Sequence, residues 1–109
     1  MLDAEEAHPH VGMMAENIVR QVAKRYPHEV ETYRELVKVP TLVPYERRRL
    51  DKVEGFLTRE IGHGIVDRML DINWVTVAIT RSHGLGEDFA RACVVSTLMR
   101  VAFRMVKAK

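Results

Sequence analysis

Two histidines near the N-terminus are the first residues in this chain whose type and spacing could hold a metal ion. His8 and His10 follow Glu5 and Glu6, and residues two apart in an extended chain point to the same side. Imidazole nitrogens and carboxylate oxygens are ligands of divalent metals. The sequence offers no second cluster of strong ligands that would complete the coordination shell. We therefore expect no metal site, and the sequence leaves open whether His8 and His10 have any role.

A third histidine has the spacing of an acid–base pair. His63 and Asp67 are four residues apart, so on a helix the carboxylate could orient the imidazole for proton transfer. No nucleophile or second carboxylate accompanies them at a spacing that catalysis would use. The segments 62–64 and 84–86 lack the third glycine and the Gly-Lys-Ser/Thr ending of phosphate-binding loops. We expect neither an enzyme nor a cofactor-binding protein, and a role for the His63 and Asp67 pair stays open.

Three consecutive arginines could contact the phosphates of a nucleic acid. Arg47, Arg48 and Arg49 concentrate positive charge near the start of an expected helix. Glu46 and Asp51 lie within ion-pairing reach, and a basic first turn is unfavourable with respect to the helix dipole. We interpret the run as a solvated helix face. The alternative function is a nucleic-acid-associated regulatory protein that binds through these three arginines together with the arginines of the expected C-terminal helix.

Composition predicts a soluble globular protein. The 109 residues suffice for one domain with a hydrophobic core, and 47% of them are hydrophobic and 29% charged. No apolar run approaches the roughly 20 residues that a membrane span needs, so we expect no membrane partner. The N-terminal segment is acidic and lacks the pattern of a signal peptide, and Cys93 is the single cysteine. These features predict a cytoplasmic protein whose residues 1–8 form a loose acidic tail.

Helical periodicity dominates the pattern of apolar residues. Apolar stripes bounded by prolines predict helices over about 9–26, over 27–39 and from residue 44 onward. Gly62 and Gly64 interrupt the last of these. Each glycine costs about 1 kcal/mol relative to alanine in a helix, so we expect a kink or a break there. The expected core consists of Val11, Ile18, Val22, Leu50, Leu57, Ile61, Val94, Leu98 and Val101.

The segment 74–80 is the one ambiguous element. Val75, Val77 and Ile79 are β-branched and favour a strand. A lone strand would have no partner in this chain apart from the short run 41–43. We expect a short helix here, with a strand as the alternative.

The most apolar element is an expected helix over 88–107. At about 100° per residue its apolar side chains fill an arc of roughly 220°, whereas a surface helix needs little more than 100°. Such a helix is either the central helix of a bundle or buries one flank in its own core and the other in a partner. The remaining polar face is made by Ser96, Thr97, Arg100, Arg104 and Lys107.

The fold class that follows is an all-α, single-domain bundle of four or five helices over 1–109, with a long, mostly apolar C-terminal helix. Because one helix has excess apolar surface and no catalytic constellation is present, we expect a small intracellular protein-interaction module: an adaptor, regulator or inhibitor. The expected partner is a second copy of the chain. The expected contact surface consists of Met99, Phe103 and Val106, with Arg100 and Arg104 at its rim.

Overall fold

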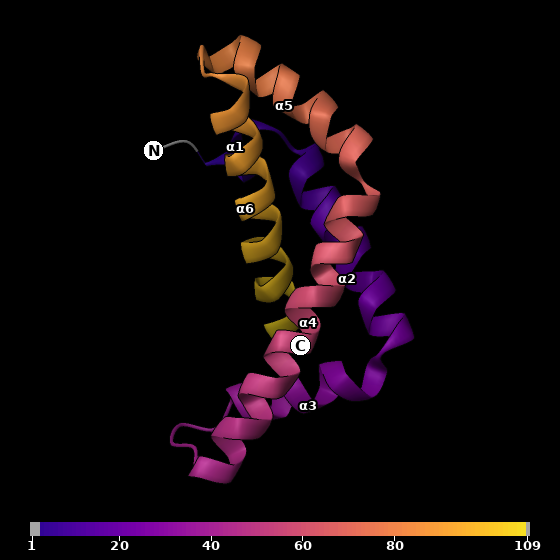
Figure 1. The fold of residues 1–109 in the computed structure, drawn as a ribbon, viewed down its shortest axis with the longest axis vertical. Coiled ribbons are helices and arrows are strands. Elements are labelled where there is room, and N and C mark those ends of the chain that lie inside the picture. Colours follow the sequence, from indigo (N-terminus) through magenta and orange to yellow (C-terminus); the bar gives the residue numbers. More distant parts are fainter. Residues whose placement is uncertain (1–2, 109) are drawn as a thin grey trace.

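Helices make up nearly all of the structure, a computed structural model that describes residues 3–108. Within this range the chain forms six α-helices and no strand (Figure 1). The helices are α1 (Ala4–Ala7), α2 (His10–Arg25), α3 (Pro27–Val37), α4 (Pro44–Asp67), α5 (Met69–His83) and α6 (Glu87–Lys107). The predicted all-α fold is confirmed. The segment 74–80 lies inside α5, so the helix alternative is the correct one there.

Prolines fix the starts of α3 and α4, as the sequence predicts. Pro27 and Pro44 occupy the first helical positions, where a missing N–H costs no hydrogen bond. The side chain of Glu46 accepts a hydrogen bond of 3.2 Å from the Val43 N–H, so this carboxylate supports the start of α4. The connector 39–43 contains no regular secondary structure.

The break between α4 and α5 lies at Arg68, not at the glycines where the sequence predicts it. α4 continues without interruption through Gly62 and Gly64. At Arg68 the backbone N–H bonds to Ile65 O, one residue short of the α-helical partner. The Arg68 guanidinium donates to Gly64 O at 2.9 Å and so satisfies the carbonyl that the backbone releases.

The N-terminal segment is ordered, which corrects the expectation of a loose tail over 1–8. Residues 1–2 lie outside the described range, but Ala4 begins the short helix α1 and is fully buried. The Asp3 carboxylate caps this helix by accepting from the Glu5 N–H at 3.0 Å. Glu5 in turn binds Arg104 of α6, so the acidic segment is held against the basic end of the chain.

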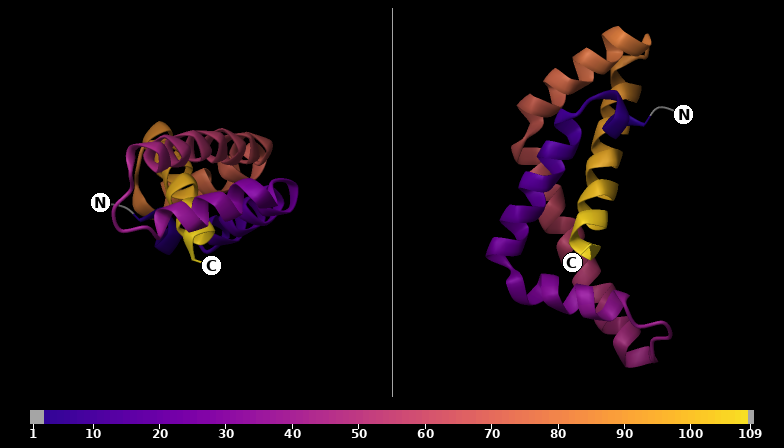
Figure 2. Two further views of the ribbon diagram at one scale, coloured as in Figure 1. Left: turned by 90° about the horizontal axis from the view of Figure 1, so that it is seen from below. Right: turned by 180° about the vertical axis from the view of Figure 1, so that it is seen from behind.

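α6 is the central helix of the bundle. It packs against all five other helices, and Figures 1 and 2 show it lying against α2, α4 and α5 with one side facing outward. All nine residues of the predicted core are buried. Thr97 is also buried, although the sequence assigns it to the polar face, because the surrounding helices cover more of α6 than its apolar arc alone.

The molecule is elongated, with extents of 48 × 27 × 20 Å. This shape arises because the first half of α4 extends past the end of α6 and packs there only with α3 (Figure 2). None of the helices formed by residues 3–108 has both the length and the hydropathy required to cross a bilayer. The fold therefore has two unlike ends: one built on α5 and the start of α6, the other on α3 and α4.

Candidate interaction surfaces

The predicted partner-binding flank of α6 is largely occupied by the chain itself. Val106 is fully buried, so it does not contribute to a free surface. Met99 and Phe103 are half-buried against the core. The Phe103 ring packs on the ring of Tyr33 from α3, with centroids 5.7 Å apart.

The two arginines at the rim of that flank have partners within the chain. Arg104 donates to Glu5 Oε2 at 2.7 Å, and this hydrogen bond and charge pairing raise the pKa of Arg104. Arg100 lies 3.8 Å from the Asp3 carboxylate. Both contacts join α6 to the N-terminal segment, which was predicted from the sequence to be a loose tail.

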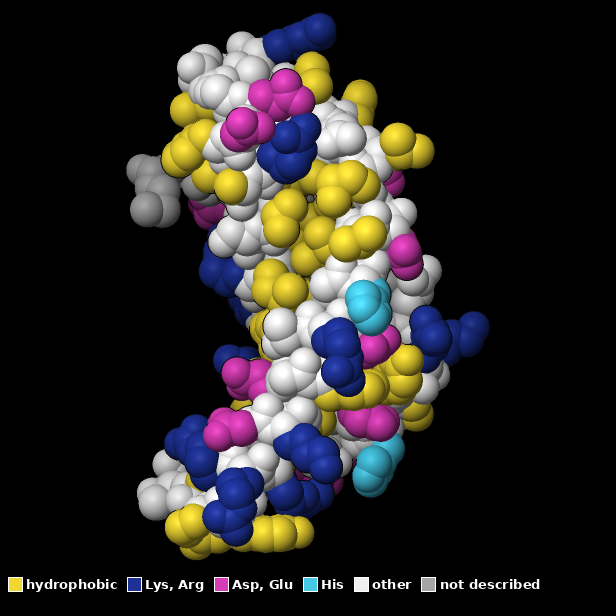
Figure 3. All heavy atoms as spheres, in the orientation of Figure 1, with side chains coloured by type: hydrophobic (Ala, Val, Ile, Leu, Met, Phe, Trp, Pro, Cys, Tyr) yellow, Lys and Arg dark blue, Asp and Glu magenta, His cyan; other side chains and the backbone are white. Residues whose placement is uncertain are grey.

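A more exposed apolar stripe runs along the outer face of α5. The side chains of Leu70, Trp74 and Val77 are 86%, 60% and 41% exposed. Their spacing places them, together with Arg81, within an arc of about 60° on the helix. Figure 3 shows hydrophobic side chains along this outer edge. We call these three apolar residues the α5 stripe; beside it lies a shallow hollow of ≈ 440 Å³ lined by Asn73, Trp74, Val77, Ala78 and Arg81.

Trp74 is held in place by the two N-terminal histidines. The rings of His8 and His10 meet the indole edge-on, with centroids 5.1 and 5.6 Å away. His8 Nδ1 accepts a hydrogen bond from the His10 N–H, and His10 Nε2 lies 3.8 Å from the Asp71 carboxylate. Within residues 3–108 no three His, Cys, Asp or Glu side chains are arranged to hold a metal ion. His8 and His10 thus form part of an aromatic contact between the start of α2 and α5.

The outward face of α4 is basic over residues 45–59. Arg48, Arg49, Lys52 and Arg59 lie within an arc of about 100°, which also includes the rings of Tyr45 and Phe56. We call these six residues the α4 basic face. In Figure 3, Lys and Arg side chains gather over this end of the molecule. Arg47 points elsewhere, because it lies about 160° from Arg49 around the helix axis.

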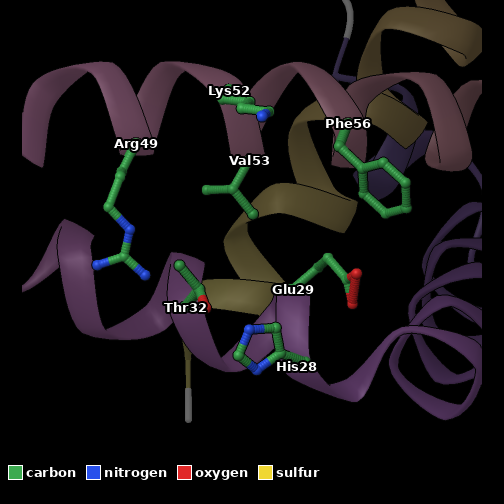
Figure 4. A pocket seen from close by; sticks show the side chains of 7 residues that line it. All are labelled: His28, Glu29, Thr32, Arg49, Lys52, Val53 and Phe56. Atoms are coloured by element: carbon green, nitrogen blue, oxygen red, sulfur yellow. The ribbon is translucent and has the colours of Figure 1, made fainter.

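A hollow of ≈ 440 Å³ lies between the α4 basic face and α3. Figure 4 shows side chains of both helices projecting into it, with the Arg49 guanidinium extending toward α3. Val53 and Phe56 form its apolar part, and Phe56 is fixed by the edge-on ring of Tyr26 at 4.8 Å. The polar lining residues are His28, Glu29, Thr32, Arg49 and Lys52.

The two remaining residues of chemical interest have ordinary surroundings. His63 Nδ1 lies 3.7 Å from Glu60, and within residues 3–108 no ion pair joins His63 to Asp67. Glu60 also approaches Arg59, so its carboxylate is shared between two basic groups. Cys93 is a half-buried free thiol.

Comparison with protein-family models, with curated proteins and with solved structures found no match to this chain.

Proposed function

We propose that this chain is a small intracellular protein-interaction module, an adaptor, regulator or inhibitor, which acts by binding and assembles as a homodimer through the α5 stripe. The observation that carries this proposal is the exposure of Leu70 and Trp74 side by side on one helix face. Exposed apolar patches of this kind mark contact sites, and a tryptophan at the centre of a patch contributes strongly to binding.

The setting of Trp74 supports a binding role. Its contacts with His8 and His10 restrict the indole before any partner arrives, so little side-chain entropy remains to be lost on association. The α6 flank predicted from the sequence has less to offer a partner, because Val106 is buried and Phe103 packs on Tyr33. The proposed contact therefore moves from α6 to α5.

The charges beside the α5 stripe favour a second copy of the chain. Exposed Asp67 and Asp71 lie near its N-terminal end, and exposed Arg81 lies at its C-terminal end. Two α5 helices that pair antiparallel about a two-fold axis bring the acidic end of each against the basic end of the other. With the axis between residues 75 and 76, Trp74 of each copy faces Val77 of the other.

The proposal includes a cytoplasmic location. It is supported by the single cysteine, Cys93, whose thiol is free and cannot form an internal disulfide.

Sedimentation equilibrium over micromolar concentrations tests the assembly. We expect a dimer for the natural chain and a folded monomer for Trp74→Glu, because a carboxylate at the centre of the contact would be buried without a partner. Val43→Glu is the matched control, since Val43 is also an exposed apolar residue but lies at the opposite end, in the 39–43 connector. This control should stay dimeric.

Exchange of the charges tests the antiparallel register. Asp71→Arg and Arg81→Asp should each weaken the dimer, and the double variant should restore it. A monomer at every concentration would contradict the homodimer. A dimer that survives Trp74→Glu but dissociates with Met99→Glu would mean that the dimer interface lies on α6, not on α5.

A further inference from the structure

We propose further that the α4 basic face binds single-stranded nucleic acid, with one nucleotide seated in the hollow between α3 and α4. The α4 basic face lies at the opposite end of the molecule from the α5 stripe, and binding there does not depend on the proposed homodimer. The sequence predicts a solvated helix face here, with nucleic-acid binding as the alternative.

Three of the four cations on the α4 basic face are not neutralised, whereas the fourth, Arg59, lies 3.9 Å from the Glu60 carboxylate. Arg48, Arg49 and Lys52 are exposed, and among residues 3–108 none of them forms an ion pair with a carboxylate. Glu46 and Asp51, which were expected to compensate the arginines, lie outside the basic arc on the helix. Glu46 is instead engaged with the Val43 N–H. Unpaired cations aligned along a helix attract a polyanion.

Two aromatic rings lie among these cations. Tyr45 is 62% exposed at the start of the face, and Phe56 lies four residues beyond Lys52. The Arg59 guanidinium stands over the Phe56 ring at 5.7 Å from its centroid. Alternating cations and rings suit a single strand, whose phosphates contact the cations while its unpaired bases contact the rings.

The hollow between the helices provides a seat for one nucleotide. Its volume of ≈ 440 Å³ falls within the range of small-ligand sites, and Val53 and Phe56 offer an apolar surface for a base. Arg49 and Lys52 at the rim can reach the adjoining phosphates. Duplex DNA does not expose its base faces in this way, so the single strand is the better fit.

Glu29 is the one carboxylate among the residues that line this hollow. A negative charge beside a phosphate site opposes binding, so Glu29 weakens the interaction in the natural chain. It also supplies a test in which binding improves, which a general loss of structure cannot imitate.

The experiment is fluorescence anisotropy with labelled oligothymidylate and oligouridylate over a series of salt concentrations. We expect weak, sequence-tolerant binding. The logarithm of the association constant should fall linearly with the logarithm of the salt concentration, with a slope of about −0.7 for each phosphate contacted. Arg49→Gln and Lys52→Gln should each weaken binding several-fold and reduce that slope. Arg47→Gln is the matched control on the same helix, and it should reduce the affinity much less. Glu29→Gln should tighten binding several-fold.

Three outcomes would overturn the proposal. Equal losses for Arg47→Gln and Arg49→Gln would mean that the positioned face is irrelevant. Equal affinity for polyglutamate, duplex DNA or anionic phospholipid vesicles would mean that the face attracts any polyanion without using bases. If Glu29→Gln fails to tighten binding while circular dichroism shows that the variant is folded, no nucleotide binds in the hollow between α3 and α4.

Discussion

At the scale of single residues, the side chain of Tyr33 connects α3, at the basic end of the molecule, to the core. It is almost completely buried in α3 and packs on Phe103 of α6. Burial raises the pKa of the Tyr33 hydroxyl above its ordinary value of 10.0, and the nearby Glu54 carboxylate raises it further. The folded state therefore holds the phenolic proton more tightly than the unfolded chain does.

This difference predicts how stability depends on alkaline pH. Tyr33 contributes its full stability below pH about 10, where the phenol is neutral in both states, and the contribution is lost as the pH rises toward the folded-state pKa. Urea unfolding of the natural chain and of Tyr33→Phe at neutral and alkaline pH checks this. The difference in unfolding free energy should shift in favour of Tyr33→Phe as the pH rises. Parallel pH profiles for the two proteins would contradict the expectation.

The contact of Trp74 with two histidines could not be predicted from residue types and spacing. The spacing of His8 and His10 drew attention to them, whereas Trp74 entered the sequence analysis only as part of an ambiguous segment. The contact among the three rings joins residues more than 60 positions apart in the chain, and no local pattern encodes it. The same holds for Arg104 and Glu5, whose ion pair orders the N-terminal segment.

At the scale of helices, Gly64 permits the close approach of α2 and α4. A β-carbon at this position would lie 3.0 Å from Cγ2 and 3.3 Å from Cγ1 of Ile18. Ile18 is buried and β-branched, so it has little freedom to move away. Gly62, on a different face of the same helix, has open space around it. One glycine is thus required by packing, and the other is not.

This contrast predicts opposite effects for two identical substitutions. Gly62→Ala should stabilise the protein by up to about 1 kcal/mol, because alanine has the higher helix propensity. Gly64→Ala should lose that gain to the contact with Ile18, and Gly64→Val should destabilise the protein by about 1 to 3 kcal/mol through overpacking. Denaturant unfolding of the three variants measures these differences. Equal stabilisation by both alanines would mean that the helices can separate without cost.

The same glycines explain why helix boundaries were only partly predictable. Pro27 and Pro44 act locally, so the sequence located the starts of α3 and α4. A glycine only weakens a helix, and packing of Ile61 and Ile65 in the core outweighs that cost. The actual end at Arg68 depends on a guanidinium that bonds to Gly64 O, and no Gly, Pro or Asn signals it.

The candidate surfaces were predictable in type but not in place. The width of the apolar arc on α6 indicated a helix with many packing partners, and α6 contacts all five other helices. Burial of one flank in a partner, the other alternative, stays a prediction. It could not indicate that the free apolar stripe lies on α5, because Leu70, Trp74 and Val77 form too narrow a pattern to stand out. The arginine run likewise suggested one cluster, whereas helix geometry separates Arg47 from Arg48 and Arg49.

At the scale of the whole molecule, the two proposed surfaces lie at opposite ends of an elongated body. α4 precedes α5 in the chain and extends beyond the N-terminal end of α5 (Figure 1). In an antiparallel α5 pair, the α4 basic faces of the two copies therefore lie at opposite ends of the dimer. A short oligonucleotide can occupy only one of them, whereas a long strand can reach both.

This arrangement predicts that the dimer prefers long strands. Once one end of a long strand is bound, the second α4 basic face meets it at a high effective concentration, so the apparent affinity should rise by roughly 10-fold or more over that for a short strand. Trp74→Glu should abolish this length preference and leave the affinity for short strands unchanged, because it removes the second site without touching the first. Anisotropy titrations with short and long oligothymidylate at constant salt measure both quantities. A length preference that persists in the monomeric variant would mean that one α4 face accounts for it alone. Loss of short-strand affinity in Trp74→Glu would mean that the two ends of the molecule are not independent.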